Sequence, residues 1–269
     1  MSRLRVLIKG AGDIATGIAI RLHRAQFQVS MTEIPMPTTV RRTVSFSSAV
    51  TEGSAVVEGI EAVLIPSADR AGEVWTAGKI PVLIDPEAAC IPHLKPDAVV
   101  DAILAKKNTG TSIADAPVVI AVGPGFTAGA DCHAVVESKR GHDLGRVILR
   151  GSGAPNTGIP GEIGGHTTDR VLRTPVGGVF RRRLDIGARV KSGDVVGVVD
   201  DVPITAQIDG ILRGVLQSGV VMTTGMKCGD IDPRCEFSHC YTVSDKARAI
   251  GGGVLEAVLS LYSKDETLE

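Results

Sequence analysis

The stretch Arg5-Val-Leu-Ile-Lys-Gly10-Ala-Gly12-Asp-Ile-Ala15 decides the interpretation of the whole chain. Residues 6–8 form a short apolar run, which is typical of a buried parallel strand. The pattern Gly10-x-Gly12-x-x-Ala15 is typical of a dinucleotide-binding turn. Its first glycine allows a tight turn, its second lets a phosphate approach the backbone, and its small third residue keeps the helix close to the strand.

A helix and a second strand follow in the register that this pattern requires. Asp13 is predicted as the helix N-cap, and Ile14, Ile18 and Leu22 recur at helical spacing. Residues 27–33 predict the next strand, and Glu33 ends it where such folds place an acid for a ribose 2′-hydroxyl. The alternative is a βαβ unit without a nucleotide, in which the glycines serve only the turn.

Composition excludes several classes of protein. The 269 residues carry a formal net charge of -1 with a pI near 6.6, so nucleic acid is not an expected partner. No run reaches the ~18 apolar residues of a membrane helix, and the N-terminus leads straight into a strand, so we expect neither a membrane segment nor a signal peptide. Five cysteines without a dense framework predict a reduced, cytoplasmic protein.

Further apolar runs predict a large parallel sheet. Strands are expected at residues 61–65, 80–86, 97–103 and 116–122, with a helix over 68–77. Strands that are separated by helical or loop crossovers predict an α/β fold. The expected first domain is therefore a Rossmann-like doubly wound parallel sheet over residues 1–125.

Ligands bind beyond the carboxyl ends of the strands in such a sheet. The candidate cofactor-binding residues follow from that rule and from the glycine pattern: Gly10, Gly12, Asp13, Ala15, Glu33, Arg41, Arg42, Gly123 and Gly125. Asp85 and Asp101 also lie near the ends of predicted strands. Arg41-Arg42 either reaches a phosphate or is a solvated surface pair, and the same two alternatives hold for Lys106-Lys107.

Asp131, His133 and Glu137 are the candidate catalytic residues. In a strand they share one face, and in a helix His133 and Glu137 lie one turn apart. A histidine flanked by acids suits proton transfer, and the same groups suit a metal ion of unknown identity. The alternative is a hydrogen-bonded structural cluster at a domain junction.

A second, β-rich domain is expected over residues 126–244. It contains a glycine- and proline-rich stretch at 151–166, which is either a lid or an interdomain linker. Further on, Gly178, Gly187 and Gly193 have the same spacing as Gly210, Gly219 and Gly225, which indicates an internal two-fold repeat.

The segment 170–232 resembles the barrel-sandwich hybrid of biotinyl and lipoyl domains. Those domains carry a modified lysine at the hairpin tip between their two halves. The corresponding tip here is Asp200-Asp201-Val202-Pro203, which contains no lysine. We therefore expect no biotin or lipoate.

The chain is expected to end in an apolar helix over residues 245–262 that docks on the first domain. Helical spacing predicts its buried face as Val254, Leu255, Val258, Leu259 and Tyr262. The triple glycine at 251–253 either approaches a phosphate or allows close packing.

Several motifs resemble those of one protein family. They are Lys9-Gly-Ala-Gly-Asp-Ile-Ala-Thr-Gly17, Arg41-Arg-Thr-Val-Ser-Phe46, Val122-Gly-Pro-Gly-Phe126, Asp131-x-His-Ala-Val-Val-Glu137, Arg140-Gly-His-x-Leu-Gly-Arg146, Asn156-Thr-Gly-x-Pro-Gly161 and Gly229-Asp-Ile-Asp-Pro-Arg234. Together they resemble the YqeB-type accessory proteins of the selenium-dependent molybdenum hydroxylase system. The resemblance implies a cytoplasmic role in maturing or supplying a selenium-requiring molybdenum enzyme, without giving the biochemical step.

The favoured interpretation is an accessory protein that binds a nucleotide, either a dinucleotide (NAD or NADP) or a molybdopterin-type nucleotide, in the crevice of the first domain. A molybdenum hydroxylase is the expected client, and a homo-oligomer is the expected assembly. One alternative is an NAD(P)-dependent oxidoreductase with His133 as its acid–base group. Another is a scaffold with a vestigial nucleotide fold, which requires only an exposed apolar patch.

Overall fold

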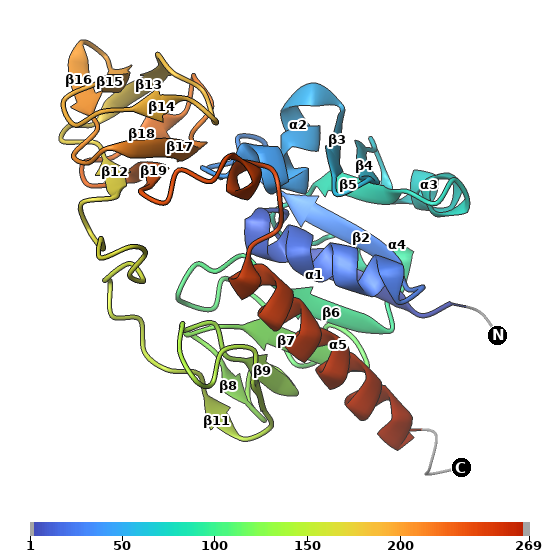
Figure 1. The fold of residues 1–269 in the computed structure, drawn as a ribbon. Coiled ribbons are helices and arrows are strands. Elements are labelled where there is room, and N and C mark those ends of the chain that lie inside the picture. The colour runs from blue at the N-terminus through green and yellow to red at the C-terminus, as the bar shows by residue number, and fades with distance from the viewer. Residues whose placement is uncertain (1–2, 266–269) are drawn as a thin grey trace. The chain divides into compact units, whose positions relative to one another are not determined.

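The computed structural model describes residues 3–265, and this part of the chain divides into two compact units (Figure 1). Unit 1 comprises residues 3–37, 45–156 and 243–265. Unit 2 comprises residues 38–44 and 157–242. Compared with the expected boundary at 125/126, residues 126–156 lie in unit 1 and the segment 38–44 lies in unit 2.

Unit 1 is built on one sheet, which has nine strands within the described residues. Their order is β10-β9-β7-β6-β1-β2-β5-β4-β3. The strands are β1 (Arg5–Lys9), β2 (Gln28–Glu33), β3 (Ser54–Val57), β4 (Ile60–Leu64), β5 (Ile80–Ile84), β6 (Ala98–Asp101), β7 (Val118–Val122), β9 (Ala134–Val136) and β10 (Val147–Ile148). Neighbouring strands are parallel except at the two edges, where β3 pairs antiparallel with β4 and β10 with β9.

The strand order reverses at β1. The chain first adds β2 on one side of β1, and β5 joins β2; it then returns to place β6 on the other side of β1. Because all these strands are parallel, their carboxyl ends lie along one edge of the sheet. The loops after β1 and β6 therefore leave that edge on either side of the reversal.

Helices pack on this sheet because its central strands are apolar on both faces. Helices α1 (Asp13–Arg24) and α5 (Asp245–Asp265) lie side by side on one face of the sheet, α1 against β1 and β2 and α5 against β7, β9 and β10 (Figure 1). The shorter helices α3 (Ala71–Thr76) and α4 (Ile91–Leu94) contribute side chains to the apolar cluster that includes Leu7 of β1 and Val99 of β6. Remaining short elements of unit 1 are η2 (Phe46–Ser48), α2 (Ala49–Glu52), η3 (Ala68–Arg70), β8 (Thr127–Ala128) and β11 (Gly151–Ser152).

Unit 2 contains two four-stranded antiparallel sheets, with orders β12-β19-β17-β14 and β16-β15-β13-β18. Its elements are η1 (Arg42–Val44), β12 (Val171–Arg173), β13 (Gly178–Arg182), β14 (Arg189–Val190), β15 (Val195–Val199), β16 (Val202–Thr205), β17 (Gly210–Val215), β18 (Val221–Met222), β19 (Lys227–Asp232) and η4 (Phe237–Cys240). The glycine repeat corresponds to β13–β14–β15 and β17–β18–β19. Each copy lends its short middle strand to the other copy, since β14 pairs with β17 and β18 pairs with β13.

Two expectations about helices need correction. Gly12, not Asp13, is the N-cap of α1, and Asp13 is the first helical residue. In α5 the buried positions include Val254 and Val258, as expected, but Leu259 is 49% exposed. The buried face is rotated toward small residues because the glycines let α5 approach its neighbours closely.

A mixed α/β fold with a large, mostly parallel sheet is therefore present, as the sequence predicts. None of the helices within the described residues is both long and apolar enough to cross a membrane.

Candidate functional site

The glycine turn lies at the carboxyl edge of the sheet, between β1 and α1. Gly10 has a φ of +94°, and a Cβ there would lie 3.1 Å from the carbonyl oxygen of Ala102, which follows β6. Glycine at this position therefore lets the loops after two neighbouring strands touch. Gly12 provides no side-chain hydrogen bond to the first turn of α1, so that turn depends on other partners for its amide groups.

Glu33 stands beside this turn at the end of β2. Its carboxylate accepts hydrogen bonds from the amides of Ala11, at 3.0 Å, and Ile34, at 2.8 Å. Burial raises the pKa of Glu33, while these two hydrogen bonds act in the opposite direction. The acid expected to meet a ribose hydroxyl thus holds the glycine turn in place in this structure.

The first turn of α1 is also contacted by the segment that contains η2. The hydroxyl of Thr16 accepts the amide of Phe46 at 2.8 Å, and the amide of Ser47 donates to the carbonyl of Ala11 at 2.8 Å. Ala15 is fully buried, which agrees with the close helix–strand approach expected of the third small residue. This arrangement fixes the height of α1 above the sheet.

A chain of three buried polar residues lies at the same edge. The sequence did not predict that these three residues meet. The ammonium Nζ of Lys9 donates to Thr111 Oγ1 at 2.7 Å, and that hydroxyl donates to Asp101 Oδ2 at 2.6 Å. Lys9 ends β1, Asp101 ends β6, and the two are register partners. The sequence signals were two charged residues that each close an apolar strand; Thr111 gave no signal.

The three candidate catalytic residues do not form one cluster. Asp131 accepts the amide of Thr127, Glu137 accepts two amides, and Nδ1 of His133 accepts the amide of Val119 at 2.9 Å. Nδ1 of His133 is thus occupied by a backbone amide. Among the described residues, no three His, Cys, Asp or Glu side chains are placed to hold a metal ion.

Gly123 and Gly125 follow β7 at the carboxyl edge, as expected, with φ values of +84° and +104°. A Cβ on Gly123 would lie 2.5 Å from the hydroxyl of Ser138, and one on Gly125 would lie 2.6 Å from the Cα of Lys107. The space that these glycines leave open is occupied by protein. Gly125 lets the loop after β6 pack closely, and Gly123 lets the side chain of Ser138 approach. Neither glycine leaves its backbone open to a ligand in this structure.

Arg41 and Arg42 belong to unit 2. Arg41 donates to the carbonyls of His239 and Thr242, and Arg42 donates to the carbonyl of Val215 and forms an ion pair of 2.5 Å with Asp185. These contacts within unit 2 hold the segment 38–44 against β17 and the residues after β19.

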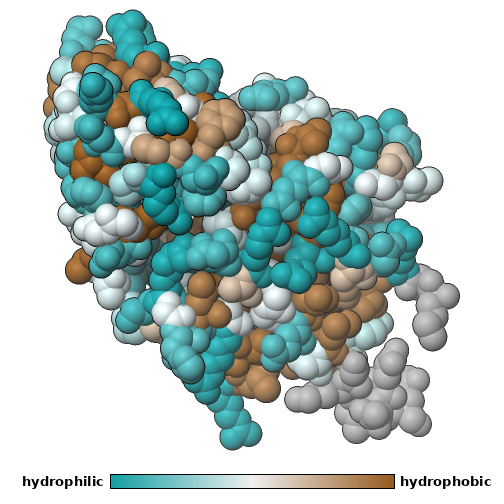
Figure 2. Space-filling model, in the orientation of Figure 1, coloured by the Kyte–Doolittle hydropathy of each residue, from teal (hydrophilic) through white to brown (hydrophobic). Residues whose placement is uncertain are grey.

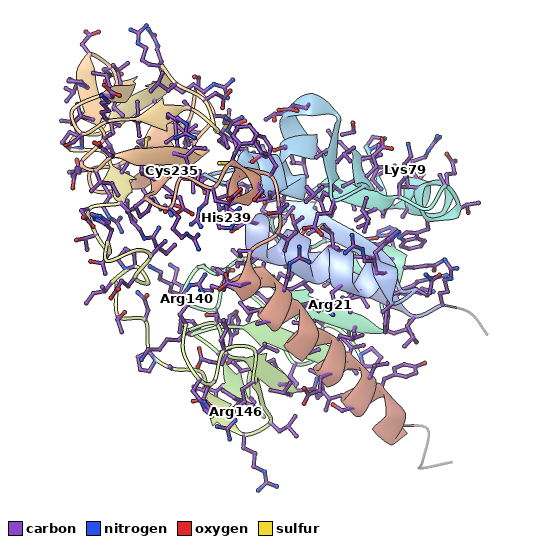
Figure 3. All side chains as sticks on the ribbon, in the orientation of Figure 1. Arg21, Lys79, Arg140, Arg146, Cys235 and His239 are labelled. Atoms are coloured by element: carbon purple, nitrogen blue, oxygen red, sulfur yellow. The ribbon has the colours of Figure 1, made fainter. Side chains whose placement is uncertain are left out.

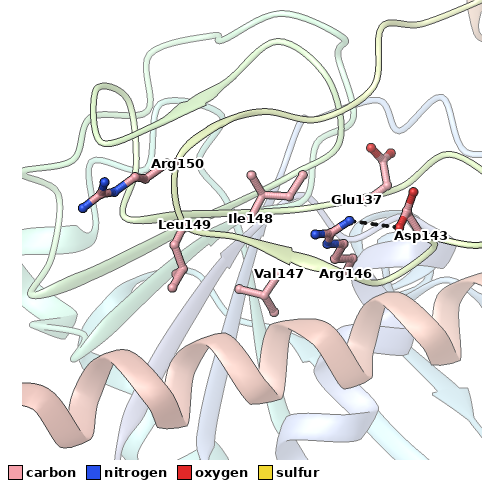
Figure 4. A pocket seen from close by; sticks show the side chains of 7 residues that line it. All are labelled: Glu137, Asp143, Arg146, Val147, Ile148, Leu149 and Arg150. Carbon is pink, nitrogen blue, oxygen red and sulfur yellow. Dashed lines mark hydrogen bonds and ion pairs between the residues drawn. The ribbon is translucent and has the colours of Figure 1, made fainter.

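A pocket of about 360 Å³ lies beside β10 (Figure 4). Its lining is Glu137, Asp143, Arg146, Val147, Ile148, Leu149 and Arg150. Glu137 is the one candidate catalytic residue in this lining. Both of its carboxylate oxygens are occupied, by the amide of Lys139 at 2.6 Å and that of Ala154 at 2.7 Å. Arg146 pairs with Asp143 at 3.2 Å (Figure 4).

The start of α5 adds a second lysine that the sequence analysis missed. Lys246 is half-buried, and burial lowers its pKa, with Asp13, Glu137 and Asp245 opposing that shift and Arg140 adding to it. Arg140, which is labelled in Figure 3, donates two hydrogen bonds to the carboxylate of Asp245, of 2.6 and 2.8 Å. The N-terminal turns of α1 and α5 thus share one set of charged groups. The signal was a basic residue in the first turn of a helix, where acids are usual.

Fold and site together define an α/β protein whose glycine turn, buried polar chain and charged helix ends gather at the carboxyl edge of a mostly parallel sheet. No protein-family model matches the sequence. The chain is similar to a protein of Escherichia coli (strain K12) named "Uncharacterized protein YqeB", with 52% identity over 256 residues. This similarity supports the resemblance to YqeB-type proteins that the motifs indicate.

The alignment covers 95% of this chain and 47% of the relative, so the chain spans about half the length of the curated relative that it matches. Among solved structures, an aspartoacylase family protein from Mesorhizobium loti aligns at 11% identity with a TM-score of 0.28, over 86% of this chain and 85% of that one. A succinylglutamate desuccinylase/aspartoacylase from Rhodobacter sphaeroides aligns at 16% identity, also with a TM-score of 0.28 and the same coverage. Scores this low carry no argument about fold or function.

Proposed function

We propose that this protein binds a nucleotide, or a pterin-nucleotide, at the carboxyl edge of the unit 1 sheet. In this proposal it acts as an accessory protein in the maturation of a selenium-dependent molybdenum hydroxylase. The observation that carries the binding proposal is the position of the α1 N-terminus. It follows a glycine turn, has a glycine N-cap without a side-chain hydrogen bond, and lies where the strand order reverses.

Physical chemistry favours an anionic ligand there. The first amides of a helix have no partners within the helix and carry a partial positive charge, so they attract phosphate. Open α/β sheets bind ligands in the crevice beyond the strand ends where the order reverses. These features support a Rossmann-like, doubly wound interpretation of unit 1.

The finer fold of unit 2 is also a proposal. The exchange of β14 and β18 between the two repeat copies supports a barrel-sandwich hybrid. The turn between β15 and β16, at Asp200 and Asp201, contains no lysine, so the proposed role of unit 2 is noncovalent contact with ligand or client.

The maturation role is supported by the motif resemblance and by the similarity to YqeB, whose own name states no function. A vestigial scaffold would require an exposed apolar patch. On the face shown in Figure 2, hydrophilic and hydrophobic side chains are interspersed. We favour ligand binding over a purely structural role because of the glycine turn and the α1 N-terminus described above.

The test is isothermal titration calorimetry, in which the purified protein is titrated with NAD, NADP, CTP and GTP in turn. At least one nucleotide should bind, and Gly12→Val should weaken its binding at least about tenfold, because branched methyl groups would occupy the phosphate position. Gly72→Val is the matched control, since a Cβ at Gly72 has no neighbour within 4 Å.

Two results would contradict the proposal. If none of the four nucleotides binds the wild-type protein, nucleotide binding of this kind is wrong. If one binds equally well to Gly12→Val, the site lies elsewhere. The maturation role is tested separately, by measuring the activity of a selenium-dependent hydroxylase in cells that carry Gly12→Val; full activity would contradict a role for this turn.

A further inference from the structure

We infer that Lys9 is a ligand-binding residue whose ammonium receives a phosphoryl group once the loop of residues 103–110 moves aside. The inference rests on the proposed function, because it places a specific cation at the same edge of the sheet. It goes beyond the glycine pattern in naming Lys9 as a binding residue and in requiring that the loop of residues 103–110 opens.

Geometry places Lys9 and Asp101 next to each other. They are register partners at the carboxyl ends of the adjacent parallel strands β1 and β6, so their side chains leave the sheet on the same face. Leu7, two residues before Lys9, marks this face as the one that packs against α3 and α4. A direct ion pair between the two charges would be the simplest arrangement. Instead, the hydroxyl of Thr111 stands between them.

The ammonium of Lys9 makes few hydrogen bonds for a group so deeply buried. Its residue is 3% exposed, and within the described residues Nζ donates a hydrogen bond only to Thr111. An ammonium has three N–H donors, and burying a charge is costly unless it is paired and hydrogen-bonded. Asp101 is joined to this ammonium through the hydroxyl of Thr111 and accepts no direct hydrogen bond from it within the described residues. Two donors therefore remain for a partner that carries negative charge.

Thr111 belongs to a loop that is otherwise largely exposed. Residues 103–110 are exposed or half-buried, whereas Thr111 is 4% exposed. We call Thr111 the plug, because it is the buried residue at the end of an exposed loop. Leu104 and Lys106 have left-handed φ values of +60° and +65°, which non-glycine residues rarely adopt. Such strain is common in lids and switch regions. The closed loop is held by the hydrogen bonds of Thr111 and by its close packing against Gly125, while its own backbone opposes this closed form at two residues.

Phosphate is the chemistry that suits the opened site. A lysine ammonium is a compact point charge that binds phosphoryl oxygens, and Lys9 stands at the carboxyl edge of the sheet, where the glycine turn also lies. A phosphoryl group would take the two unused donors. It would also supply the negative charge that now reaches Lys9 only indirectly.

Pyrophosphate is the probe, and calorimetry on the full chain is the measurement. We expect wild type to bind it, and Lys9→Met, which keeps the length of the side chain, to lose at least about tenfold in affinity. Lys107→Met is the matched control: it removes the same charge from the exposed part of the loop and should change affinity less than about threefold. Thr111→Val keeps the shape of the plug without its hydroxyl. Because the closed loop competes with the ligand, this variant should bind pyrophosphate more tightly, by about threefold or more.

Hydrogen exchange gives a second, ligand-free readout. In Thr111→Val the amides of residues 103–110 should exchange faster than in wild type, while those of β1 and β6 stay unchanged. The inference is overturned if wild type does not bind pyrophosphate, if Lys9→Met binds it as well as Lys107→Met does, or if Thr111→Val weakens binding as much as Lys9→Met. Its failure is distinguishable from failure of the proposed function: a nucleotide that binds wild type and Lys9→Met equally leaves the nucleotide proposal standing and removes Lys9 from it.

Discussion

At the scale of single residues, hydrogen-bond partners decide which charged groups are available for chemistry. Glu137 is 5% exposed, and its two oxygens accept the amides of Lys139 and Ala154. A carboxylate in this position joins two stretches of backbone that lie on either side of β10. Such a group is needed for the fold whether or not it also faces a ligand.

We therefore expect Glu137→Gln to destabilise unit 1 by about 1–3 kcal/mol, because the amide NH₂ would face one of the two backbone N–H donors. Thermal unfolding followed by the fluorescence of Trp75, the single tryptophan of the chain and part of unit 1, is the measurement. Glu87→Gln, at an exposed position, is the control. An unchanged midpoint would show that the two hydrogen bonds contribute nothing and would return Glu137 to the list of purely functional candidates.

A pair of buried acids organises one sheet of unit 2. Asp230 and Asp232 lie in β19, and Arg213 bridges them from a bulge in β17, with distances of 2.5 and 3.4 Å. Arg170 pairs with Asp230, and Arg234 pairs with Asp232. A bulge re-aims a side chain within a ladder, which here lets one guanidinium reach two carboxylates.

Asp232 should make unit 2 sensitive to acid. Burial favours its neutral form, but hydrogen bonds from Arg234 and the charge of Arg213 outweigh burial and lower its pKa to about 2, from an ordinary 3.8. A carboxylate whose folded pKa is depressed stabilises the fold above its unfolded pKa, and that stability is lost as the pH falls through the folded pKa. The contribution, about 2 kcal/mol at neutral pH, should therefore disappear between roughly pH 4 and pH 2.

Asp232→Asn should remove this contribution at pH 7 and flatten the acid dependence. The free energy of unfolding is measured by urea titration at several pH values between 2 and 7. Hydrogen exchange of peptides from β17 and β19 reports the stability of unit 2 separately. Asp201→Asn, at the exposed tip of the β15–β16 hairpin, should leave both quantities unchanged. Equal stability of Asp232→Asn and wild type at pH 7 would mean that the desolvation of the acid cancels its ion pairs.

The positions of the glycine turn and of Glu33 were predictable because local pattern decides them, whereas their binding of a ligand stays a prediction. Gly10, Gly12 and Glu33 come together because a strand, a tight turn, a helix and a strand can fold in few ways. Lys9 closes the same strand, but its partner Thr111 lies 102 residues further along the chain. No local pattern gives a contact of that sequence separation. His133 and Glu137 were predicted to form one cluster from their side-chain types alone. The sequence does not show that backbone amides donate hydrogen bonds to both side chains.

At the scale of elements, the packing of α5 depends on glycines that the sequence left with two possible roles. Gly251, Gly252 and Gly253 lie inside α5. A Cβ on Gly251 would lie 3.0 Å from the carbonyl oxygen of Gly17 in α1, and one on Gly253 would collide with the carbonyl oxygen of Gly145. A Cβ on Gly252 would meet nothing within 4 Å. These contacts favour close packing as the role of two of the three glycines.

This difference gives a prediction with its control built in. Gly253→Ala should destabilise unit 1 by about 1–3 kcal/mol, because the backbone of residue 145 must move. Gly252→Ala should stabilise it by about 0.5–1 kcal/mol, because alanine is the better residue inside a helix. Unfolding in urea, followed by Trp75 fluorescence, measures both. If the two variants shift the midpoint in the same direction, the close approach of α5 to residue 145 is wrong.

Elements were predictable from the sequence where hydrophobic runs are long and uniform. Strands β1, β2, β5 and β7 fall within about two residues of the expected ranges, because each is an apolar run bounded by turn residues. The segment 131–137 was open between strand and helix, since its polar residues suit either period. It forms the short strand β9, which joins the sheet beside β7. The edge strands β3 and β10 were missed because edge positions tolerate mixed polarity.

At the scale of the whole molecule, chain connectivity decides how the two units are made. Unit 1 needs the C-terminal helix, since α5 packs along α1, and unit 2 needs the early segment 38–44, whose Thr43 hydroxyl donates to the carbonyl of Cys240 at 2.6 Å. A sequence-based boundary cannot show such exchanges, because apolar periodicity marks elements and not the unit they join. The expected absence of biotin and lipoate, drawn from the lysine-free tip of the β15–β16 hairpin, stays a prediction.

The linker between the units offers a last prediction. Residues 153–162 have no regular structure, the division between units falls after Asn156, and Ile159 is 66% exposed. Exposed irregular segments are the preferred sites of proteolysis, and thermolysin cuts before apolar residues. Its first cut should therefore fall between Gly158 and Ile159, and Ile159→Asp should slow it at least about tenfold. The fragments 1–158 and 159–269 should still co-elute in native buffer, because the second supplies α5 to the unit that the first mostly builds, and the first supplies residues 38–44 to the other. They should separate only in denaturant. A first cut inside β17 or β19, or fragments that part without denaturant, would contradict this account of how the chain is shared between its units.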